Sequence, residues 1–356
     1  MWFAVPPSCY GEHQYPPYLG ISLTDRCNLR CFFCRREWFD RGDLEFENIF
    51  KLQRAIRYAR IIQLSMYGEP LLYPRFEDVL SYIYSINDRR DLIHMVTNGT
   101  RLSRHVASLL RGHLGGLVIS LNAATEETYN RDMKYGNFRE LMSAVEAFLS
   151  ELDERDRRKV ALSFVAHTGN YREMPDFVSL ACDLGISAVT ILPYRVVRAE
   201  DSRLSLLHVK ENYDATLDRA LDVGAKRGVK FNASRFSNVG YFGDFRYCLK
   251  PFEECWIQSN GDVEVCCFTD RYSMGNVYRS TFEAVWFGEA YRRLRKERWL
   301  PACHRCPGYR PFDDYAHHIH PMAAGSEESE RIREQYDMLR TGAATPQASS
   351  CDVSPS

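Results

Sequence analysis

Short apolar runs alternate with longer amphipathic stretches over the first two-thirds of the chain. The apolar runs have the length and composition of buried strands, and they lie at residues 19–23, 61–65, 93–97, 117–121, 161–165 and 188–192. The stretches between and after them have the spacing of a helix face, at residues 48–60, 75–86, 104–110, 138–152, 174–183 and 212–228. This alternation predicts an α/β fold with a parallel, barrel-like sheet whose functional residues follow the strand ends.

The composition of the sequence changes from about residue 236, where Gly, aromatic and Cys residues become frequent. Asn260-Gly261 is typical of a hairpin turn between candidate strands 255–259 and 262–266. The chain ends in a charged helical stretch, followed by a tail that contains Ser, Pro and Ala. We expect this tail to be disordered. We therefore expect an N-terminal arm, a core barrel, a small second domain, and a helical and disordered tail, over residues 1–17, 18–235, 236–322 and 323–356.

Charge and hydropathy exclude several classes of protein. The chain has 46 Lys+Arg and 47 Asp+Glu, a net charge of −1, which gives no electrostatic case for nucleic acid or an anionic membrane as principal partner. No run approaches the roughly 18 apolar residues of a membrane helix. Prolines stand near the N-terminus where a signal peptide needs an apolar run. We expect a cytoplasmic protein.

Twelve cysteines are the unusual feature of the composition. A reducing compartment does not favour disulfides, so metal ligands, reactive thiols and core residues are the interpretations to separate. Cysteines cluster in two groups, one at positions 27, 31 and 34 and one between positions 248 and 306. This bimodal distribution indicates two separate sites.

Three thiolates at x3 and x2 spacing can reach one metal centre from a single tight loop. A structural zinc normally takes four ligands, and the next histidine after this group is His94, far along the chain. An iron–sulfur cubane with three protein cysteines instead leaves one iron open to a small molecule.

The segment Cys27-Asn-Leu-Arg-Cys31-Phe-Phe-Cys34 resembles the cluster loop of the radical S-adenosylmethionine (SAM) superfamily, Cys-x3-Cys-x-aromatic-Cys. The resemblance implies a [4Fe–4S] cluster bound by these cysteines, whose open iron is chelated by the amino and carboxylate groups of SAM. It implies that Phe33 packs near the adenine. It also implies a partial (β/α)6 TIM-like barrel, which agrees with the six predicted strands.

Further segments resemble SAM-binding motifs of the same superfamily, in the same order. Met66-Tyr-Gly-Glu-Pro70 resembles the Gly-Gly-Glu-Pro segment that binds the SAM amino group, with Tyr67 in place of the first Gly. Val96–Thr100 and Ser120–Ala123 resemble the ends of the third and fourth strands. Strand-end capping and turns remain the alternative for the single polar residues. The resemblance implies cofactor-binding roles for Phe33, Tyr67, Gly68, Glu69, Asn98, Ser120 and Asn122.

Two positions depart from the superfamily pattern. Many relatives carry Asp at the position of Asn122 and Arg at the position of Met133, so the clamp on the SAM carboxylate differs here. Lys134 or Arg131 could substitute. Asn170, after the fifth predicted strand, is a further candidate.

The second cysteine group resembles the C-terminal auxiliary-cluster domain of the superfamily, which has a longer SPASM form with two clusters and a shorter twitch form with one. Because only Cys351 follows Cys306, a single auxiliary cluster is the better count. Cys266 and Cys267 are adjacent on a predicted strand and point to opposite faces, so only one can be a ligand. Cys255 competes with Cys248 as first ligand. The resemblance favours a second [4Fe–4S] cluster bound by Cys248, Cys266, Cys303 and Cys306, with a zinc site as the structural alternative.

Two of the remaining cysteines, Cys255 and Cys267, stand near the auxiliary ligands and are candidates for a hydrogen-atom donor, with a buried structural thiol as the alternative. Cys182 lies in an apolar helical stretch and is expected in the core.

The resemblance implies an enzyme that generates a 5′-deoxyadenosyl radical and abstracts a hydrogen atom from its substrate. The leading hypothesis is oxidation or epimerisation of a carbon of a sugar or aminocyclitol glycoside, a small polar metabolite, in natural-product or antibiotic biosynthesis. The alternatives are a maturase that epimerises or crosslinks a ribosomal peptide, and a non-catalytic iron–sulfur scaffold. The chemistry implies a flavodoxin- or ferredoxin-type reductant.

Overall fold

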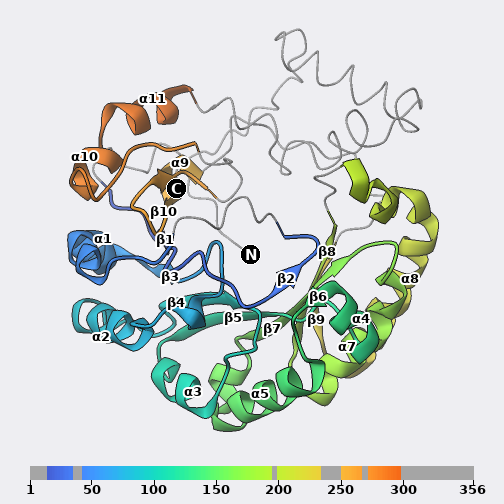
Figure 1. The fold of residues 1–356 in the computed structure, drawn as a ribbon. Helices are drawn as coiled ribbons and strands as arrows, with labels where there is room; N and C mark the ends of the chain where they lie inside the picture. Colours follow the sequence, from blue (N-terminus) through green and yellow to red (C-terminus); the bar gives the residue numbers. More distant parts are fainter. Residues whose placement is uncertain (1–13, 35–41, 195–198, 234–249, 267–271, 298–356) are drawn as a thin grey trace, which may run out of the picture.

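The computed structural model describes residues 14–34, 42–194, 199–233, 250–266 and 272–297 (Figure 1). Several predictions lie outside the described residues: those for the tail at 323–356 and for Cys248, Cys267, Cys303 and Cys306. Among the described residues, no helix is long and apolar enough to cross a membrane.

A nine-stranded sheet forms the centre of the fold, in the order β11-β10-β1-β3-β4-β5-β7-β8-β9. Its neighbours from β10 to β9 are all parallel, and β11 is antiparallel to β10. The six predicted strands are confirmed as β1 (Tyr18–Ile21), β3 (Ile61–Gln63), β4 (Ile93–Thr97), β5 (Leu114–Ser120), β7 (Val160–Ala166) and β8 (Ala188–Pro193). In the described part of the chain the sheet stays open, as expected for a partial barrel. The sequence reading missed β9 (Lys230–Ala233), which extends the edge beyond β8.

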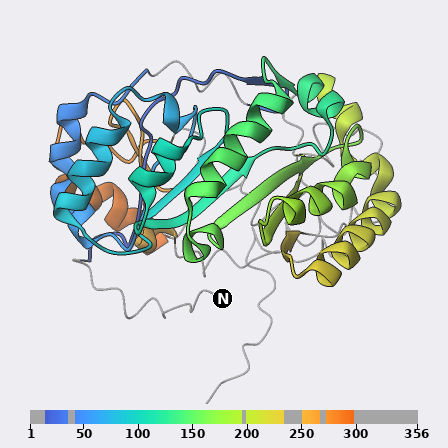
Figure 2. The ribbon, with the colours of Figure 1, turned by 90° about the horizontal axis from the view of Figure 1, so that it is seen from below.

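The predicted helices form, and Figures 1 and 2 show them side by side along the outer face of the curved sheet. They are α1 (Gln53–Tyr58), α2 (Phe76–Ile86), α3 (Arg104–Leu110), α5 (Phe138–Glu151), α7 (Met174–Asp183) and α8 (Lys210–Arg227). The stretch before α1 is a 3₁₀ helix, η3 (Phe46–Leu52). Side chains cap several N-termini: Ser103 accepts the Val106 N–H, and Asn137 accepts those of Arg139 and Glu140. Shorter elements stand between these along the chain: α4 (Glu126–Asp132), α6 (Glu154–Arg157), η4 (Pro70–Leu72), η5 (Tyr171–Glu173), η6 (Ala199–Leu204) and η7 (Leu206–Val209).

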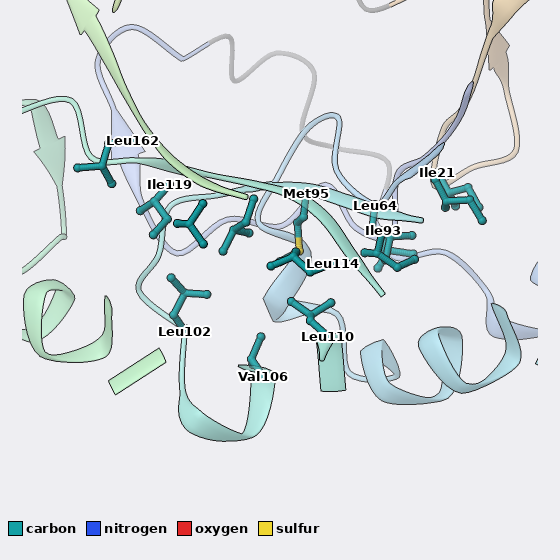
Figure 3. Packing of buried hydrophobic residues seen from close by; sticks show 14 of the residues in the cluster. Ile21, Leu64, Ile93, Met95, Leu102, Val106, Leu110, Leu114, Ile119 and Leu162 are labelled. Atoms are coloured by element: carbon teal, nitrogen blue, oxygen red, sulfur yellow. The ribbon is translucent and has the colours of Figure 1, made fainter. Parts of the chain in front are cut away.

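The main hydrophobic core lies between the sheet and these helices. Figure 3 shows strand residues such as Met95 and Ile119 packed against Leu102, Val106 and Leu110 from the α3 region. Burial of each such side chain contributes about 1.5–3 kcal/mol to folding. Alternate strand residues face the opposite, inner side of the sheet. On that side Val96 and Leu192 remain 42% and 48% exposed, so the inner face is not filled by the described residues.

A two-stranded antiparallel sheet joins β2 (Arg30–Cys31) to β6 (Met133–Lys134). Arg30 pairs with Lys134, and Cys31 pairs with Met133. Because β6 follows α4 directly, this small sheet ties the first cysteine loop to the end of that helix.

The predicted C-terminal hairpin is present as β10 (Glu254–Ile257) and β11 (Val263–Glu264). It turns at Gly261, whose φ of +84° suits glycine. The hairpin is continuous with the core sheet, because β10 pairs in parallel with β1. Helices α9 (Lys250–Glu253), α10 (Phe282–Trp286) and α11 (Glu289–Glu297) accompany it.

Residues from the predicted N-terminal arm pack on α10. The Tyr15 hydroxyl donates to Glu283 over 2.6 Å, and the Trp286 indole donates to the Gln14 carbonyl over 2.9 Å. The first described residues are therefore in direct contact with α10.

Candidate functional site

The loop that carries Cys27, Cys31 and Cys34 follows β1 at the carboxyl end of the sheet. The sulfur of Cys27 accepts the Leu29 backbone N–H at 3.5 Å and the Asn98 side-chain N–H at 3.7 Å. Burial raises the pKa of the Cys27 thiol, and these two donors act in the opposite direction. N–H groups directed at sulfur are suited to a thiolate ligand.

The donor set fits an iron–sulfur cluster. All three cysteines come from one short loop, and none of them is in a disulfide. Among the described residues, no three His, Cys, Asp or Glu side chains converge as ligands of a single metal ion would. A cubane binds each cysteine through a different iron atom, so its ligands do not converge on one ion. The three thiols are the residues that could hold a cluster here, because they lie on one short loop.

Gly68 lies directly against the residues that precede Cys27. Its φ is +66°, and a Cβ at this position would lie 2.5 Å from the Thr24 carbonyl oxygen and 2.7 Å from that of Arg26. The next N–H, of Glu69, donates to the Arg26 carbonyl over 2.8 Å. Only glycine allows this approach, which connects the predicted SAM segment to the start of the cysteine loop.

Glu69 is buried, with 1% of its surface exposed, and its carboxylate is fully engaged within the protein. One oxygen accepts from the Thr97 hydroxyl at 2.7 Å and the Leu71 N–H at 3.2 Å, and the other accepts the Asn98 N–H at 2.7 Å. Burial raises the pKa of Glu69, against the effect of these donors. The carboxylate thus links the segment after β3 to the end of β4.

Asn98, at the end of β4, bridges to the cysteine loop. Its side-chain N–H donates to the side-chain oxygen Oδ1 of Asn28 over 2.9 Å, and its own side-chain oxygen accepts the Thr100 N–H and hydroxyl over 3.0 and 2.7 Å. The structure therefore brings together the first cysteine loop, the Gly68–Glu69 segment and the end of β4.

The predicted cofactor residues after β5 differ in accessibility. Ser120 is half-buried and accepts the Ser163 hydroxyl at 3.4 Å. Asn122 is buried with a φ of +61°, a conformation that Asn tolerates better than most residues. Its side-chain oxygen accepts the Val165 N–H at 2.9 Å, and its N–H lies 3.6 Å from the Met133 sulfur. The Asn122 amide therefore holds β7 and β6, whereas Ser120 is partly open on the inner face.

Asn170, a further candidate, is also engaged internally. Its side-chain N–H donates to the carbonyls of Asn122 and Val165, over 3.2 and 3.0 Å. The two aromatic candidates, Phe33 and Tyr67, are half-buried.

One buried polar group near the cysteine loop was missed by the sequence reading. His167, after β7, lies 3.0 Å from Asp132, and Asp132 also forms two bonds with Arg131, of 2.8 and 3.0 Å. The His167 ring packs edge-on against Phe32, at 5.0 Å between centroids. The sequence could have indicated His167 as a site residue, because it follows a predicted strand. No sequence pattern marks Asp132. Arg131, considered above as a carboxylate clamp, is occupied by Asp132.

The structure does not favour Cys255 as a hydrogen-atom donor. In the parallel register Cys255 stands beside Leu19 and Ile62, which face the helices, and its side chain is 0% exposed. Burial raises the pKa of this thiol to about 12, against the effect of Tyr291 and Arg295. A donor to a substrate on the inner face would need the opposite orientation.

Cys266, after β11, is the one predicted auxiliary ligand within the described residues, and it is also buried.

Comparison with known families identifies two segments. Residues 21–181 match the model of the radical SAM superfamily, and residues 248–307 match that of an iron–sulfur cluster-binding domain, SPASM.

Several curated proteins are similar to the chain. A GTP 3′,8-cyclase of Geobacter sulfurreducens is 30% identical over 293 residues, which cover 78% of this chain and 88% of that protein. A tungsten-containing aldehyde ferredoxin oxidoreductase cofactor-modifying protein of Pyrococcus furiosus is 23% identical, covering 81% and 86%. A GTP 3′,8-cyclase of Petrotoga mobilis is 30% identical, covering 47% of this chain and 52% of the relative, so the chain spans about half the length of that relative.

Solved structures share the fold. The structure of native anSMEcpe with bound AdoMet has a TM-score of 0.61 at 16% identity and covers 92% of this chain and 98% of that one. Streptococcus suis SuiB has a TM-score of 0.59 at 15% identity, with 80% and 68% covered.

Proposed function

Because the chain belongs to the radical SAM superfamily and carries an iron–sulfur cluster-binding SPASM domain, we propose that it oxidises or epimerises a carbon of a small polar metabolite. A sugar or aminocyclitol glycoside is the proposed substrate class. Domains of these two families use SAM, a [4Fe–4S] cluster and an auxiliary iron–sulfur cluster.

SAM and the reduced first cluster, when bound, supply the radical that removes a hydrogen atom from the substrate. The protein's own part is to position these groups. In our proposal Cys27, Cys31 and Cys34 hold the cluster, and Gly68 and Glu69 maintain the loop at the required place. Such positioning must hold the reacting atoms within about 3–3.5 Å.

A row of hydroxyl groups on the inner face of the sheet carries the substrate proposal. Ser120, Ser163 and Thr190 are register partners on β5, β7 and β8, at positions alternate to the buried core residues. Ser120 is the last residue of β5, at the carboxyl end where barrel-like folds place their sites, and Ser163 and Thr190 continue the row across the middle of β7 and β8. Side chains that can both donate and accept hydrogen bonds suit a substrate rich in hydroxyl or amino groups.

The position of the C-terminal hairpin supports oxidation. β10 pairs with β1, and β1 leads directly into the first cysteine loop. A hairpin that ends in Cys266 therefore starts beside the strand that delivers Cys27. We propose that residues near Cys266 hold an auxiliary cluster that would supply an electron acceptor, so that a substrate radical on an alcohol carbon could lose one electron to it and its hydroxyl proton to solvent to give a ketone.

Peptide modification is a second candidate, favoured by a different observation. The exposed Val96 and Leu192 side chains give part of the inner face an apolar character that suits peptide side chains. SuiB, a structural neighbour, has been solved bound to its precursor peptide SuiA, although that likeness concerns the fold.

The test is incubation of the reconstituted, reduced enzyme with SAM and a panel of glycosides in deuterium oxide. A flavodoxin or ferredoxin is the proposed physiological reductant. We expect substrate-dependent 5′-deoxyadenosine, with a product that has lost a pair of hydrogens for oxidation or gained deuterium at an inverted carbon for epimerisation. Cys31→Ser should abolish both signals, and Cys182→Ser, which changes a cysteine on α7, should preserve them. Turnover of a peptide with no response to any glycoside would overturn the substrate proposal.

A further inference from the structure

The hydroxyl of Tyr129 is an unpartnered polar group in the interior. Tyr129 lies in α4 and is 0% exposed, and its oxygen has no hydrogen-bond partner among the described residues. Its ring packs against Phe138, with 5.7 Å between centroids. Leaving a hydroxyl buried without a partner costs about 1–3 kcal/mol, so its presence calls for an explanation.

The local chain path places Tyr129 beside the first cysteine loop. It stands one helical turn before Met133, and Met133 pairs with Cys31 in the β2–β6 sheet. The Tyr129 hydroxyl has Gly136 on one side, where a Cβ would lie 2.9 Å from the oxygen. Glycine at position 136 thus leaves room for the phenol at this site.

The electrostatic environment of Tyr129 also indicates that it lies near the first cysteine loop. Burial raises the pKa of Tyr129, and the charges that raise it further are those of Cys31 and Cys27. These are two of the three proposed cluster ligands. The hydroxyl is therefore buried near the sulfurs of Cys31 and Cys27, and it has no hydrogen-bond partner within the part of the chain that the structure describes.

We propose that the Tyr129 hydroxyl donates a hydrogen bond to a sulfur of the first cluster, on the Cys31 side, and raises the reduction potential of that cluster. A reduced cluster carries more negative charge than an oxidised one, so a donor to its sulfur stabilises the reduced form. Tyr129 acts here as a positioning and tuning residue, since it touches the cluster and not the substrate. The inference rests on the proposed function only in placing a cluster at Cys27, Cys31 and Cys34.

The test is a redox titration of the loaded full-length protein, followed by electron paramagnetic resonance. The first cluster is recognised by the change in its signal when SAM is added. We expect Tyr129→Phe to lower the reduced-to-oxidised ratio at a fixed potential about tenfold, a shift of 59 mV for a one-electron couple. Tyr213→Phe, which removes a buried hydroxyl from α8, should leave the ratio unchanged. An unchanged ratio in Tyr129→Phe at full iron content would overturn the proposal.

A second measurement covers the case in which Tyr129→Phe assembles its cluster poorly. In wild-type protein made with ring-deuterated tyrosine, hyperfine spectroscopy of the reduced, SAM-responsive cluster should detect coupled tyrosine deuterons. Absence of this coupling would also overturn the proposal. Neither readout needs a substrate, so a wrong substrate class leaves both intact. If Cys31→Ser keeps the SAM-responsive signal, the cluster assignment fails instead.

Discussion

His167 donates its Nε2–H to Asp132 over 3.0 Å, in a buried contact beneath the cysteine loop. The other ring nitrogen accepts the Gly169 N–H at 3.1 Å, which leaves the proton on Nε2. Phe32 packs on this ring, and its N–H donates to the Asp132 carbonyl over 3.4 Å. The segment between Cys31 and Cys34 thus packs on the His167–Asp132 pair, and neither residue of this pair belongs to the cysteine motif.

Asp132→Asn tests this support. Burial alone would raise the pKa of Asp132, but the bonds from His167 and Arg131 hold it below its usual range, so the native residue is a carboxylate. The amide loses one acceptor oxygen and the charge, and we expect a loss of about 1.5–3 kcal/mol in stability. Thermal unfolding of the variant and of the wild-type protein measures this difference in stability.

The matched control for this change is Asp222→Asn, which removes an exposed ion pair to Lys226. An exposed helical pair of this kind contributes about 0.3–0.5 kcal/mol. Equal effects of the two substitutions would contradict a structural role for the buried pair.

Glu69→Gln is expected to weaken SAM binding through the position of the surrounding backbone. One of the two oxygens that serve Leu71, Thr97 and Asn98 becomes an NH₂ group, which cannot accept their hydrogen bonds. We expect about tenfold weaker SAM binding to the reconstituted protein, equivalent to about 1.4 kcal/mol. Equilibrium dialysis gives the affinity. Glu154→Gln, on an exposed side chain, should bind SAM as wild type does, and undiminished affinity in the Glu69 variant would refute the linking role.

Gly68→Ala separates close packing from backbone strain when compared with Gly112→Ala. Both glycines have positive φ, +66° and +80°, so both variants incur the left-handed penalty of about 1–2 kcal/mol. Only the Cβ at Gly68 would meet backbone oxygens, since nothing lies within 4 Å of a Cβ at Gly112. We therefore expect a lower melting temperature and less bound iron for Gly68→Ala than for Gly112→Ala. Similar iron content in the two variants would show that the contact with Thr24 does not shape the loop.

Local patterns were sufficient to predict most of the sheet and helix layer. The strands are short buried runs flanked by polar turns, so their positions depend on neighbouring residues alone. The β2–β6 sheet could not be predicted in this way, because Arg30–Cys31 and Met133–Lys134 are two-residue strands with no pattern of their own. The same holds for the pairing of β10 with β1, which joins opposite parts of the chain.

The candidate site shows the same division. The spacing of Cys27, Cys31 and Cys34 indicated a cluster loop from one short segment. The function of the Glu69 carboxylate depends on Thr97 and Asn98, which belong to a different strand end. Sequence motifs mark such a residue, but its hydrogen-bond partners appear only once the strands are assembled.

Cys255→Ala distinguishes a core thiol from a ligand or donor. Since Cys255 faces the helix side with Leu19, its loss should remove a small buried group and cost about 1 kcal/mol. We expect the iron content to remain at about eight per chain, whereas Cys266→Ala should reduce it to about four. Iron assay of the two anaerobically reconstituted variants gives this comparison. The ratio of epimerised to oxidised product should also be unchanged in Cys255→Ala. A loss of iron would make Cys255 a ligand. A switch from epimer to ketone would make it the hydrogen donor, because a substrate radical that receives no hydrogen atom from a thiol could instead lose an electron to an auxiliary cluster and a proton to solvent.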